Sequence, residues 1–363
     1  MRKIILAAGG TGGHFFSAQA LGEILHNKGY QVHLITDYRC KKYITSDIKF
    51  KVHVYNLKSS KSNILGKLVF YKRLMISILR SIFIIAKIKP DISIGFGGYP
   101  SFPIIFASKM FNIPIIVYEQ NCFIGKTNQY FLNIAKVIAL TYQDTINLPS
   151  TYKHKAVVVG HIARSNIRRI NPDKQKKSSD PKSNFNILIF GGSQGAKFFS
   201  ELIPEAVSLL IKNKITQPIS ILQQARSEDI VRLKNQYKNL DVSYKISDFI
   251  YDIDKEYQAA DLVICRSGAS TIAEITHLKI PAIFIPYPWS THNHQLDNAR
   301  ALSKDSGYWY FTQDDPDILQ KISDLMLQLI QNPKLLSVKR NADKLTKNGE
   351  ILLADTIEKI INK

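Results

Sequence analysis

A chain of 363 residues is too long for one typical hydrophobic core and suits two domains of about 100–200 residues each. The chain is 45% hydrophobic and 21% charged, an ordinary globular composition that argues against a disordered or fibrous protein. A net charge of +20 predicts an acidic partner, such as nucleic acid, an anionic membrane surface or a phosphorylated substrate, unless it reflects a general lysine bias.

Local composition argues against two further classes, disulfide-rich proteins and proteins with a membrane-spanning helix. The three cysteines, Cys40, Cys122 and Cys265, are scattered and form no disulfide framework, which favours a reducing cytosol. The most hydrophobic stretch, residues 65–88, is interrupted by basic side chains and lacks the roughly 18 consecutive apolar residues of a membrane-spanning helix.

The first half of the chain alternates short apolar strands with helices. Hydrophobic periodicity predicts helices at Ser17–Lys28, Ile64–Lys87 and Pro103–Phe111. The strands expected around them are Ile4–Ala8, Tyr30–Asp37, Lys51–Tyr55, Asp91–Phe96, Ile113–Tyr118, Lys136–Leu140 and Ala156–Gly160.

The alternation restarts after a lysine- and serine-rich linker at 170–185. Strands are expected at Asn186–Phe190, Gln217–Gln223, Val242–Ile246, Asp261–Cys265 and Pro281–Pro286. Helices are expected at Phe198–Lys212, Glu228–Lys238, Tyr251–Ala260, Ser270–His277, Gln295–Ser303, Asp317–Ile330 and Gly349–Asn362. This pattern predicts an α/β protein with two doubly wound parallel sheets.

Three glycine turns follow predicted strands, at Gly9–Gly13, Gly97–Ser101 and Gly191–Gly195. A strand–turn–helix junction of this kind presents backbone N–H groups at a helix N-terminus, where they attract anions. The first turn is not a P-loop, and it is a poor dinucleotide fingerprint even though Asp37 could serve as a ribose-binding acid.

The segment Cys265–Ile275, with the sequence CRSGASTIAEI, lies where a buried strand meets a helix. Ser267, Gly268, Ser270 and Thr271 offer small groups and N–H donors to a phosphate, and Glu274 can accept hydrogen bonds from a ribose diol. The alternative is purely structural, with Ser270 as the N-cap and Glu274 as a solvated acid in the first turn.

Taken together, the motifs GGTGGH, GGYPS, YEQN, GGSQGAK, CRSGASTIAE and PYP…HQLDNA resemble, in this order, those of the MurG family of bacterial glycosyltransferases. The resemblance spans nearly the whole chain. It implies a GT-B fold, in which two Rossmann-like domains face a cleft. It also implies inverting transfer of N-acetylglucosamine from UDP-N-acetylglucosamine to lipid I, giving lipid II for peptidoglycan synthesis, with no metal and no cofactor.

The resemblance also implies a division of labour between the domains. Residues 1–163 would form the acceptor domain, with a C-terminal helix at about 345–363 packed back on it, and residues 164–344 would bind the UDP-sugar. The acceptor diphosphate would contact Gly12, Gly13, Gly97, Gly98 and Tyr99. The UDP-N-acetylglucosamine site would comprise Thr11, Gly12, Gly13, Asn121, Arg164, Ser193, Phe249, Ile250, Ala269, Ser270, Thr271, Ile272, Ala273, Glu274, His294, Gln295 and Asn298.

Transfer to the muramyl C4 hydroxyl needs a general base. His14 is the first candidate, because an imidazole titrates near neutral pH and lies at the first glycine turn, and Glu119 is the weaker alternative. His14 could instead only position the diphosphate or cap its helix.

The long helix at 64–87 is expected to attach the protein peripherally to the cytoplasmic face of the bacterial inner membrane. Apolar side chains and basic ones around them would suit an anionic leaflet, and they comprise Leu68, Lys72, Arg73, Met75, Leu79 and Arg80. The alternative is that the apolar face packs on the sheet.

Two other functions compete with this interpretation. One is a different GT-B enzyme, such as a UDP-N-acetylglucosamine 2-epimerase or a glycolipid glycosyltransferase. The other is a basic nucleic-acid-binding protein, which the dispersed basic residues and the lack of a nucleic-acid-binding motif argue against. No nucleic-acid partner is therefore expected.

Overall fold

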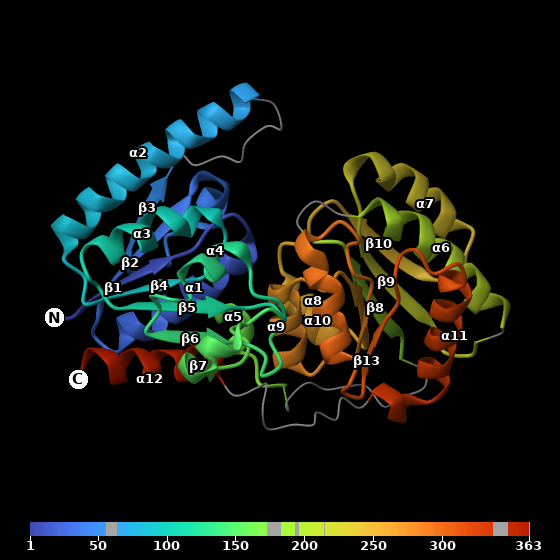
Figure 1. The fold of residues 1–363 in the computed structure, drawn as a ribbon. Coiled ribbons are helices and arrows are strands. Elements are labelled where there is room, and N and C mark those ends of the chain that lie inside the picture. The colour runs from blue at the N-terminus through green and yellow to red at the C-terminus, as the bar shows by residue number, and fades with distance from the viewer. Residues whose placement is uncertain (56–63, 173–182, 193–195, 214, 337–347, 363) are drawn as a thin grey trace. The chain divides into compact units, whose positions relative to one another are not determined.

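The computed structural model describes residues 1–55, 64–172, 183–192, 196–213, 215–336 and 348–362. The chain divides into two compact units: unit 1 is Met1–Ser165 with Asp343–Lys363, and unit 2 is Asn166–Ala342. Each unit contains a parallel β-sheet with helices on both faces (Figure 1), so the expected α/β fold class with two doubly wound sheets is confirmed.

The described part of unit 1 is built on a seven-stranded parallel sheet. Across the sheet the strands are β3 (Lys51–Tyr55), β2 (Gln31–Asp37), β1 (Lys3–Ala7), β4 (Ile92–Gly95), β5 (Ile115–Glu119), β6 (Val137–Leu140) and β7 (Ala156–Val158). Ile4 of β1 pairs with Val32 on one side and with Ile92 on the other. The central strands are buried on both faces, as their continuous apolar runs require.

Helices cover both faces of this sheet. The core of one face joins Ile4 and Leu6 to α1 (Gly12–Asn27) and α12 (Gly349–Ile361). The core of the other face joins Ile5 and Ala7 to α2 (Ile64–Ile88) and α3 (Phe102–Met110). The shorter helices are α4 (Lys126–Phe131) and α5 (Ser165–Arg168).

The described part of unit 2 has a six-stranded parallel sheet. Its order is β10 (Ser243–Ser247), β9 (Ile219–Gln224), β8 (Phe185–Phe190), β11 (Leu262–Cys265), β12 (Ala282–Phe284) and β13 (Tyr308–Tyr310). One face packs on α6 (Lys197–Lys212), α7 (Ile230–Lys238) and α11 (Ile318–Gln331). Figure 1 shows the remaining helices on the other side of the sheet, namely α8 (Ile253–Ala259), α9 (Ala269–Leu278) and α10 (His294–Leu302).

The main differences from the sequence-based expectations lie at glycine-rich or short elements. Helix α1 begins at Gly12 rather than Ser17, with the N–H of Phe15 donating to the carbonyl of Thr11. Glycine has a low helix propensity, so the sequence does not indicate that the helix starts here. The first turn is stabilised by tertiary contacts and not by its own sequence. Strand β13 and helix α4 were not expected, since segments of three and six residues carry little periodic signal.

The strand order fixes where a ligand can bind. In unit 1 the order reverses between β1 and β4, and in unit 2 it reverses between β8 and β11. Ligands of open parallel sheets bind beyond the carboxyl ends of the strands at such reversals, because the following loops diverge to opposite faces there. The first two glycine turns follow β1 and β4, while Gly191 and Cys265–Gly268 follow β8 and β11.

Candidate active site

The two glycine turns of unit 1 meet beyond β1 and β4. A Cβ atom added to Gly98 would lie 2.7 Å from the carbonyl oxygen of Gly9, so only glycine permits this approach. Gly97 and Gly98 both have positive φ, at 84° and 73°, which other residues rarely adopt. The result is a bare backbone surface at the reversal point of the sheet.

His14 lies in the first turn of α1 and packs on this surface. Its Nδ1 is 3.0 Å from the hydroxyl oxygen of Thr11. Its Nε2 lies 3.4 Å from the position that a Cβ on Gly97 would occupy. The ring is therefore held between the two turns, with its orientation fixed by Thr11.

A buried carboxylate fixes the first turn. Asp37, at the end of β2, accepts a hydrogen bond from the backbone N–H of Gly10 at 2.9 Å and is fully buried. Its second oxygen accepts a bond from Nε of Arg39 at 2.6 Å. With both oxygens engaged inside the protein, Asp37 anchors the turn and is not placed as a ribose-binding acid.

Arg39 brings a positive charge to the same surface. Its guanidinium stacks on the Tyr99 ring at 4.7 Å, and its Nη2 lies 3.2 Å from the position of a Cβ on Gly10. The side chain is 38% exposed. Arg39 thus bridges the two glycine turns. The sequence does not point to it, because the 3₁₀ helix in which it lies, Tyr38–Tyr43, carries no motif.

Glu119 has a different environment from His14. Its carboxylate is buried and accepts bonds from the backbone N–H of Asn121 and Gly125 and from the side-chain amides of Asn121 and Asn128. Burial raises the pKa of Glu119, and these hydrogen bonds oppose the shift. The arrangement favours a structural role for Glu119, with Asn121 as its partner, over the role of a base.

Asn128 connects Glu119 to the glycine turns and was not singled out from the sequence. Its amide nitrogen donates to the carboxylate of Glu119 and to the carbonyl of Tyr118, and it lies 3.3 Å from the Cβ position of Gly97. A single asparagine within an unpredicted short helix gives no signal that sequence reasoning could have used.

In unit 2, α9 begins directly at the strand reversal. Gly268 is its N-cap residue, so the alternative in which Ser270 caps the helix is wrong. A Cβ on Gly268, or one on Gly192 after β8, would meet no described atom within 4 Å. The helix N-terminus therefore opens onto free space, as a phosphate site requires. Ser193 lies outside the described residues.

The predicted donor-site residues of α9 differ in exposure. Ser270 and Thr271 are half-buried in the first turn, where their N–H groups and hydroxyls can reach a ligand. Ala269, Ile272 and Ala273 are buried, so a ligand could meet little but their backbone. Glu274 is 2% exposed, and its Oε2 accepts a bond from the hydroxyl of Tyr257 at 3.0 Å, which contradicts the alternative of a solvated acid.

The start of α10 is tied to the loop after β11. Ser267 donates to the backbone oxygen of Gln295 at 2.8 Å, and Asn298 donates back to the carbonyl of Ser267 at 3.2 Å. The side-chain oxygen of Gln295 accepts from the N–H of Tyr287, while Nδ1 of His294 lies 2.7 Å from the carbonyl oxygen of Thr291. Through Ser267, the loop that precedes α9 is therefore joined by hydrogen bonds to Gln295 and Asn298 of α10.

Arg266 stabilises this network and was not assigned a role from the sequence. Its Nη1 donates to the carbonyls of Ile285 and Pro286, and its Nη2 donates to the side chain of Gln313. Burial lowers the pKa of Arg266 to about 10, so the guanidinium stays charged at neutral pH. It holds the loop after β12 beside the loop after β11.

The remaining predicted donor residues belong to other elements of the chain. Phe249 and Ile250 follow β10, where Gln224 donates to the carbonyl of Asp248 and the Phe249 ring is 43% exposed. Arg164 lies in unit 1 and stacks on the Phe16 ring at 4.6 Å.

Helix α2 carries an exposed apolar face. Leu68, Met75, Leu79 and Phe83 are 58–68% exposed, whereas Ser81 and Ile85 on the other side are buried. The alternative in which the apolar face packs on the sheet therefore holds for only part of the helix, because Ile82, Ile85 and Ile88 join the core while these four side chains do not. Lys72 and Arg80 are exposed and Arg73 is half-buried. Among the described residues, no helix is long and apolar enough to cross a bilayer.

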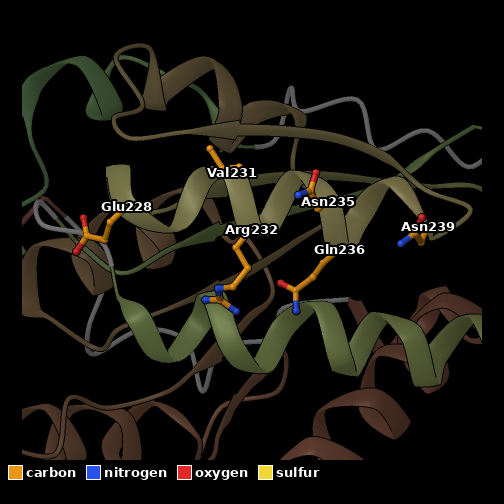
Figure 2. Close-up of a pocket in the computed structure, with 6 residues that line it drawn as sticks. All are labelled: Glu228, Val231, Arg232, Asn235, Gln236 and Asn239. Atoms are coloured by element: carbon orange, nitrogen blue, oxygen red, sulfur yellow. The ribbon is translucent and has the colours of Figure 1, made fainter.

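A cavity of about 600 Å³ lies along α7 in unit 2 (Figure 2). Figure 2 shows Arg232 and Gln236 on one side of the helix and Val231 and Asn235 on the other. None of the predicted site residues lines it. The described part of the chain also holds no group of three or more His, Cys, Asp or Glu side chains placed to ligate a metal.

Comparisons with known proteins agree over the whole chain. The N-terminal domain of glycosyltransferase family 28 matches residues 4–140, and the C-terminal domain of that family matches residues 186–356. A Rickettsia bellii protein is 44% identical over 99% of this chain and 100% of its own length. It is named UDP-N-acetylglucosamine–N-acetylmuramyl-(pentapeptide) pyrophosphoryl-undecaprenol N-acetylglucosamine transferase.

Solved structures show the same architecture. The crystal structure of Acinetobacter baumannii MurG has a TM-score of 0.78 at 25% identity, covering 99% of this chain and 100% of that one. A UDP-N-acetylglucosamine 2-epimerase from Neisseria meningitidis has a TM-score of 0.69, covering 98% of this chain and 100% of that one. At 14% identity, the epimerase shows likeness of fold alone.

Proposed function

Because this chain belongs to the MurG family within glycosyltransferase family 28, we propose that it moves N-acetylglucosamine from UDP-N-acetylglucosamine to the muramyl C4 hydroxyl of lipid I, giving lipid II. The observation that carries the proposal is 44% identity to a transferase of that name over the full length of both chains. The 2-epimerase alternative rests on a structure that is only 14% identical to this chain.

The donor is proposed to bind unit 2. Its diphosphate would lie at the open N-terminus of α9, where Ser270 and Thr271 supply hydroxyl and N–H donors. The leaving UDP gains negative charge as the glycosidic bond breaks, and fixed donors aimed at it stabilise that charge without rearrangement. Glu274 would hold the ribose hydroxyls, and Gln295 and Asn298 the sugar, as the family resemblance suggests.

The acceptor is proposed to bind unit 1. Its diphosphate would lie on the bare backbone of Gly12, Gly13, Gly97 and Gly98, and Arg39 would add the positive charge that glycines cannot provide. Tyr99 would act through Arg39, on which it stacks.

His14 is proposed as the general base. If the hydroxyl oxygen of Thr11 accepts the Nδ1 proton, the lone pair lies on Nε2, the nitrogen on the side of the second glycine turn. The C4 hydroxyl would then lose its proton to Nε2 as its oxygen attacks the anomeric carbon from the face opposite UDP, which inverts that centre.

The acceptor carries a lipid, and we propose that α2 holds the protein on the membrane that contains it. The exposed side chains Leu68, Met75 and Leu79 would enter the interface, and Lys72, Arg73 and Arg80 would meet anionic headgroups. This places the protein peripherally on the cytoplasmic face of the inner membrane.

The decisive experiment follows labelled sugar from UDP-N-acetylglucosamine to a lipid I analogue, with and without a chelator. Transfer in both conditions is expected. Failure of transfer would overturn the proposed function, while loss only with chelator would overturn its metal-free mechanism. Conversion of UDP-N-acetylglucosamine into UDP-N-acetylmannosamine without an acceptor would instead support the epimerase.

A further inference from the structure

A second cavity, of about 350 Å³, lies in unit 1 beneath the last turns of α2. Its floor is formed by the amino ends of β1, β2 and β3, through Lys3, Gln31, His33, Lys51 and His53. Since the glycine turns follow the carboxyl ends of parallel strands, this cavity lies at the opposite edge of the sheet from the proposed acceptor site.

The cavity is strongly basic. Lys3, Lys51 and Lys87 line it together with the two histidines, and its nine lining residues include no carboxylate. One N–H of Lys3 donates to the carbonyl of Ile88 at 2.9 Å, which leaves the ammonium group two further donors. Such a wall attracts an anion and repels a metal cation.

The two histidines add a polar group that the fold itself does not satisfy. Nδ1 of His33 lies 3.1 Å from Nε2 of His53, and the rings stack. His33 is 4% exposed, and its Nε2 has no hydrogen-bond partner among the described residues. Because this nitrogen is itself buried, a ligand in the cavity would act on the histidine pair through its charge and not by direct contact with Nε2.

We propose that this cavity binds a phosphate group, held by the ammonium groups of Lys3, Lys51 and Lys87 beside the stacked rings of His33 and His53. Phosphate offers several acceptor oxygens in a tetrahedral arrangement, which suits donors that come from two strands and one helix. The site is separate from sugar transfer and does not depend on it.

Two sources could supply the phosphate. Phe83 lines the cavity and is also 68% exposed on the apolar face of α2, which favours the headgroup of a membrane lipid. A soluble phosphate ester presents the same oxygens. The experiment described next distinguishes these two sources by comparing a soluble phosphate ester with a phospholipid.

The test titrates inorganic phosphate into the full-length protein at pH 7 and constant ionic strength, and follows the histidine Cε1 proton resonances by NMR. Saturable shifts are expected for His33 and His53 and not for the exposed His154. Burial, His53, Lys51 and Lys3 together lower the pKa of His33 to about 4. A bound phosphate should raise this pKa, with proton uptake.

Matched variants exclude a general charge effect. Lys51→Gln with Lys87→Gln should weaken phosphate binding at least about tenfold, because two charged hydrogen bonds are lost. Lys109→Gln with Lys136→Gln removes the same charge from exposed positions of unit 1 outside the cavity and should leave binding unchanged. Thermal unfolding confirms that each variant is folded.

The second arm compares glycerol phosphate with a short-chain phosphatidylglycerol below its micelle concentration. Tighter binding of the lipid, lost in Phe83→Ser, assigns the site to a membrane headgroup, whereas equal affinities assign it to soluble phosphates. If all ligands give shifts that never saturate, or if both double variants weaken binding equally, the proposal is overturned.

Discussion

His14 gains its orientation from groups that lie on two different strand–helix connections. Thr11 holds one ring nitrogen, and the backbone of Gly97 and Gly98 packs against the ring. Because both glycine turns are needed, a change at either should disturb the imidazole. Substitutions of single residues at this surface should therefore have effects on catalysis and on acceptor binding that can be told apart.

Replacing His14 with alanine should lower kcat for sugar transfer about a hundredfold or more, because general-base assistance is lost. Steady-state transfer to a lipid I analogue measures it. His154→Ala, an exposed histidine of the same unit, serves as the matched control and should keep full activity. A His14→Ala variant with normal single-turnover chemistry and only weaker acceptor binding would show that His14 positions the diphosphate.

Arg39→Ala should raise KM for the acceptor about tenfold and leave KM for UDP-N-acetylglucosamine unchanged, because a charged hydrogen bond to the acceptor diphosphate is lost. Arg39→Lys should recover only part of the effect, since lysine cannot both stack on Tyr99 and bond to Asp37 in the same geometry. Lys41→Ala, a neighbouring exposed charge, is the control. Equal effects on both substrates would contradict this assignment.

At the scale of elements, the described part of unit 1 leaves Leu68, Met75, Leu79 and Phe83 of α2 exposed. Met75→Ser with Leu79→Ser should reduce binding to anionic vesicles, because two exposed apolar side chains no longer enter the interface. Neutralising Lys72 and Arg80 should weaken it by about 1 kcal/mol per charge. Sedimentation with vesicles measures both effects.

The control for α2 is Val231→Ser on α7, an equally exposed apolar side chain in unit 2. It should leave vesicle binding unchanged. Binding that survives the double serine variant of α2 would place the membrane contact elsewhere.

Helix α12 depends on one glycine. A Cβ on Gly349 would clash with the carbonyl oxygen of His161 and lie 2.9 Å from that of Gly160. Gly349→Ala should therefore destabilise unit 1 by about 3 kcal/mol, since backbone must move to admit the methyl group. Denaturant unfolding measures the loss, and Gly268→Ala, which has open space around it, should cost far less.

Elements with strong periodic patterns could be predicted from the sequence, and short ones could not. The buried strands β1, β4 and β11 follow from their apolar runs, and α2 from its length and amphipathic pattern. The first turn of α1 could not be predicted, because Gly12 and Gly13 are poor helix formers that tertiary contacts hold in place.

The candidate site likewise contains residues that could be predicted from the sequence and residues that could not. The glycine motifs predicted the loops of the candidate site. Arg39 and Asn128 contact those loops from elements that carry no motif. Their roles depend on distances that only the folded chain defines. The internal hydrogen bonds of Glu119 could not be predicted either, since their donors come from a loop of irregular geometry.

At the scale of the whole molecule, acid should weaken unit 1 before unit 2. Burial lowers the pKa of both His33 and His53, so between pH 7 and about pH 5 the unfolded chain binds more protons than the folded one. Stability is therefore full above the unfolded pKa of about 6.5 and falls as pH drops towards the folded value. The melting temperature at pH 5 should be several degrees lower than at pH 7.

His33→Gln should flatten this pH dependence, and His154→Gln should not. Comparing each variant with the parent protein cancels the contribution of Glu119, whose raised pKa acts in the opposite direction. A pH dependence unchanged by His33→Gln would contradict the assignment. Added phosphate should raise the melting temperature at pH 6 if the basic cavity binds it, because a ligand of the folded state stabilises that state.

The position of α12 also has a consequence for how the protein is made. Unit 1 takes its last helix from the far end of the chain, and Leu353, Ala354 and Ile357 of that helix belong to its core. A ribosome therefore releases every strand of both sheets before unit 1 can close its core, while unit 2 is already complete in sequence. During synthesis the second unit can reach its native state first, while the face of the N-terminal sheet that α1 covers still lacks α12. Chaperones that bind exposed apolar surfaces should accordingly protect the nascent N-terminal half until α12 has been synthesised.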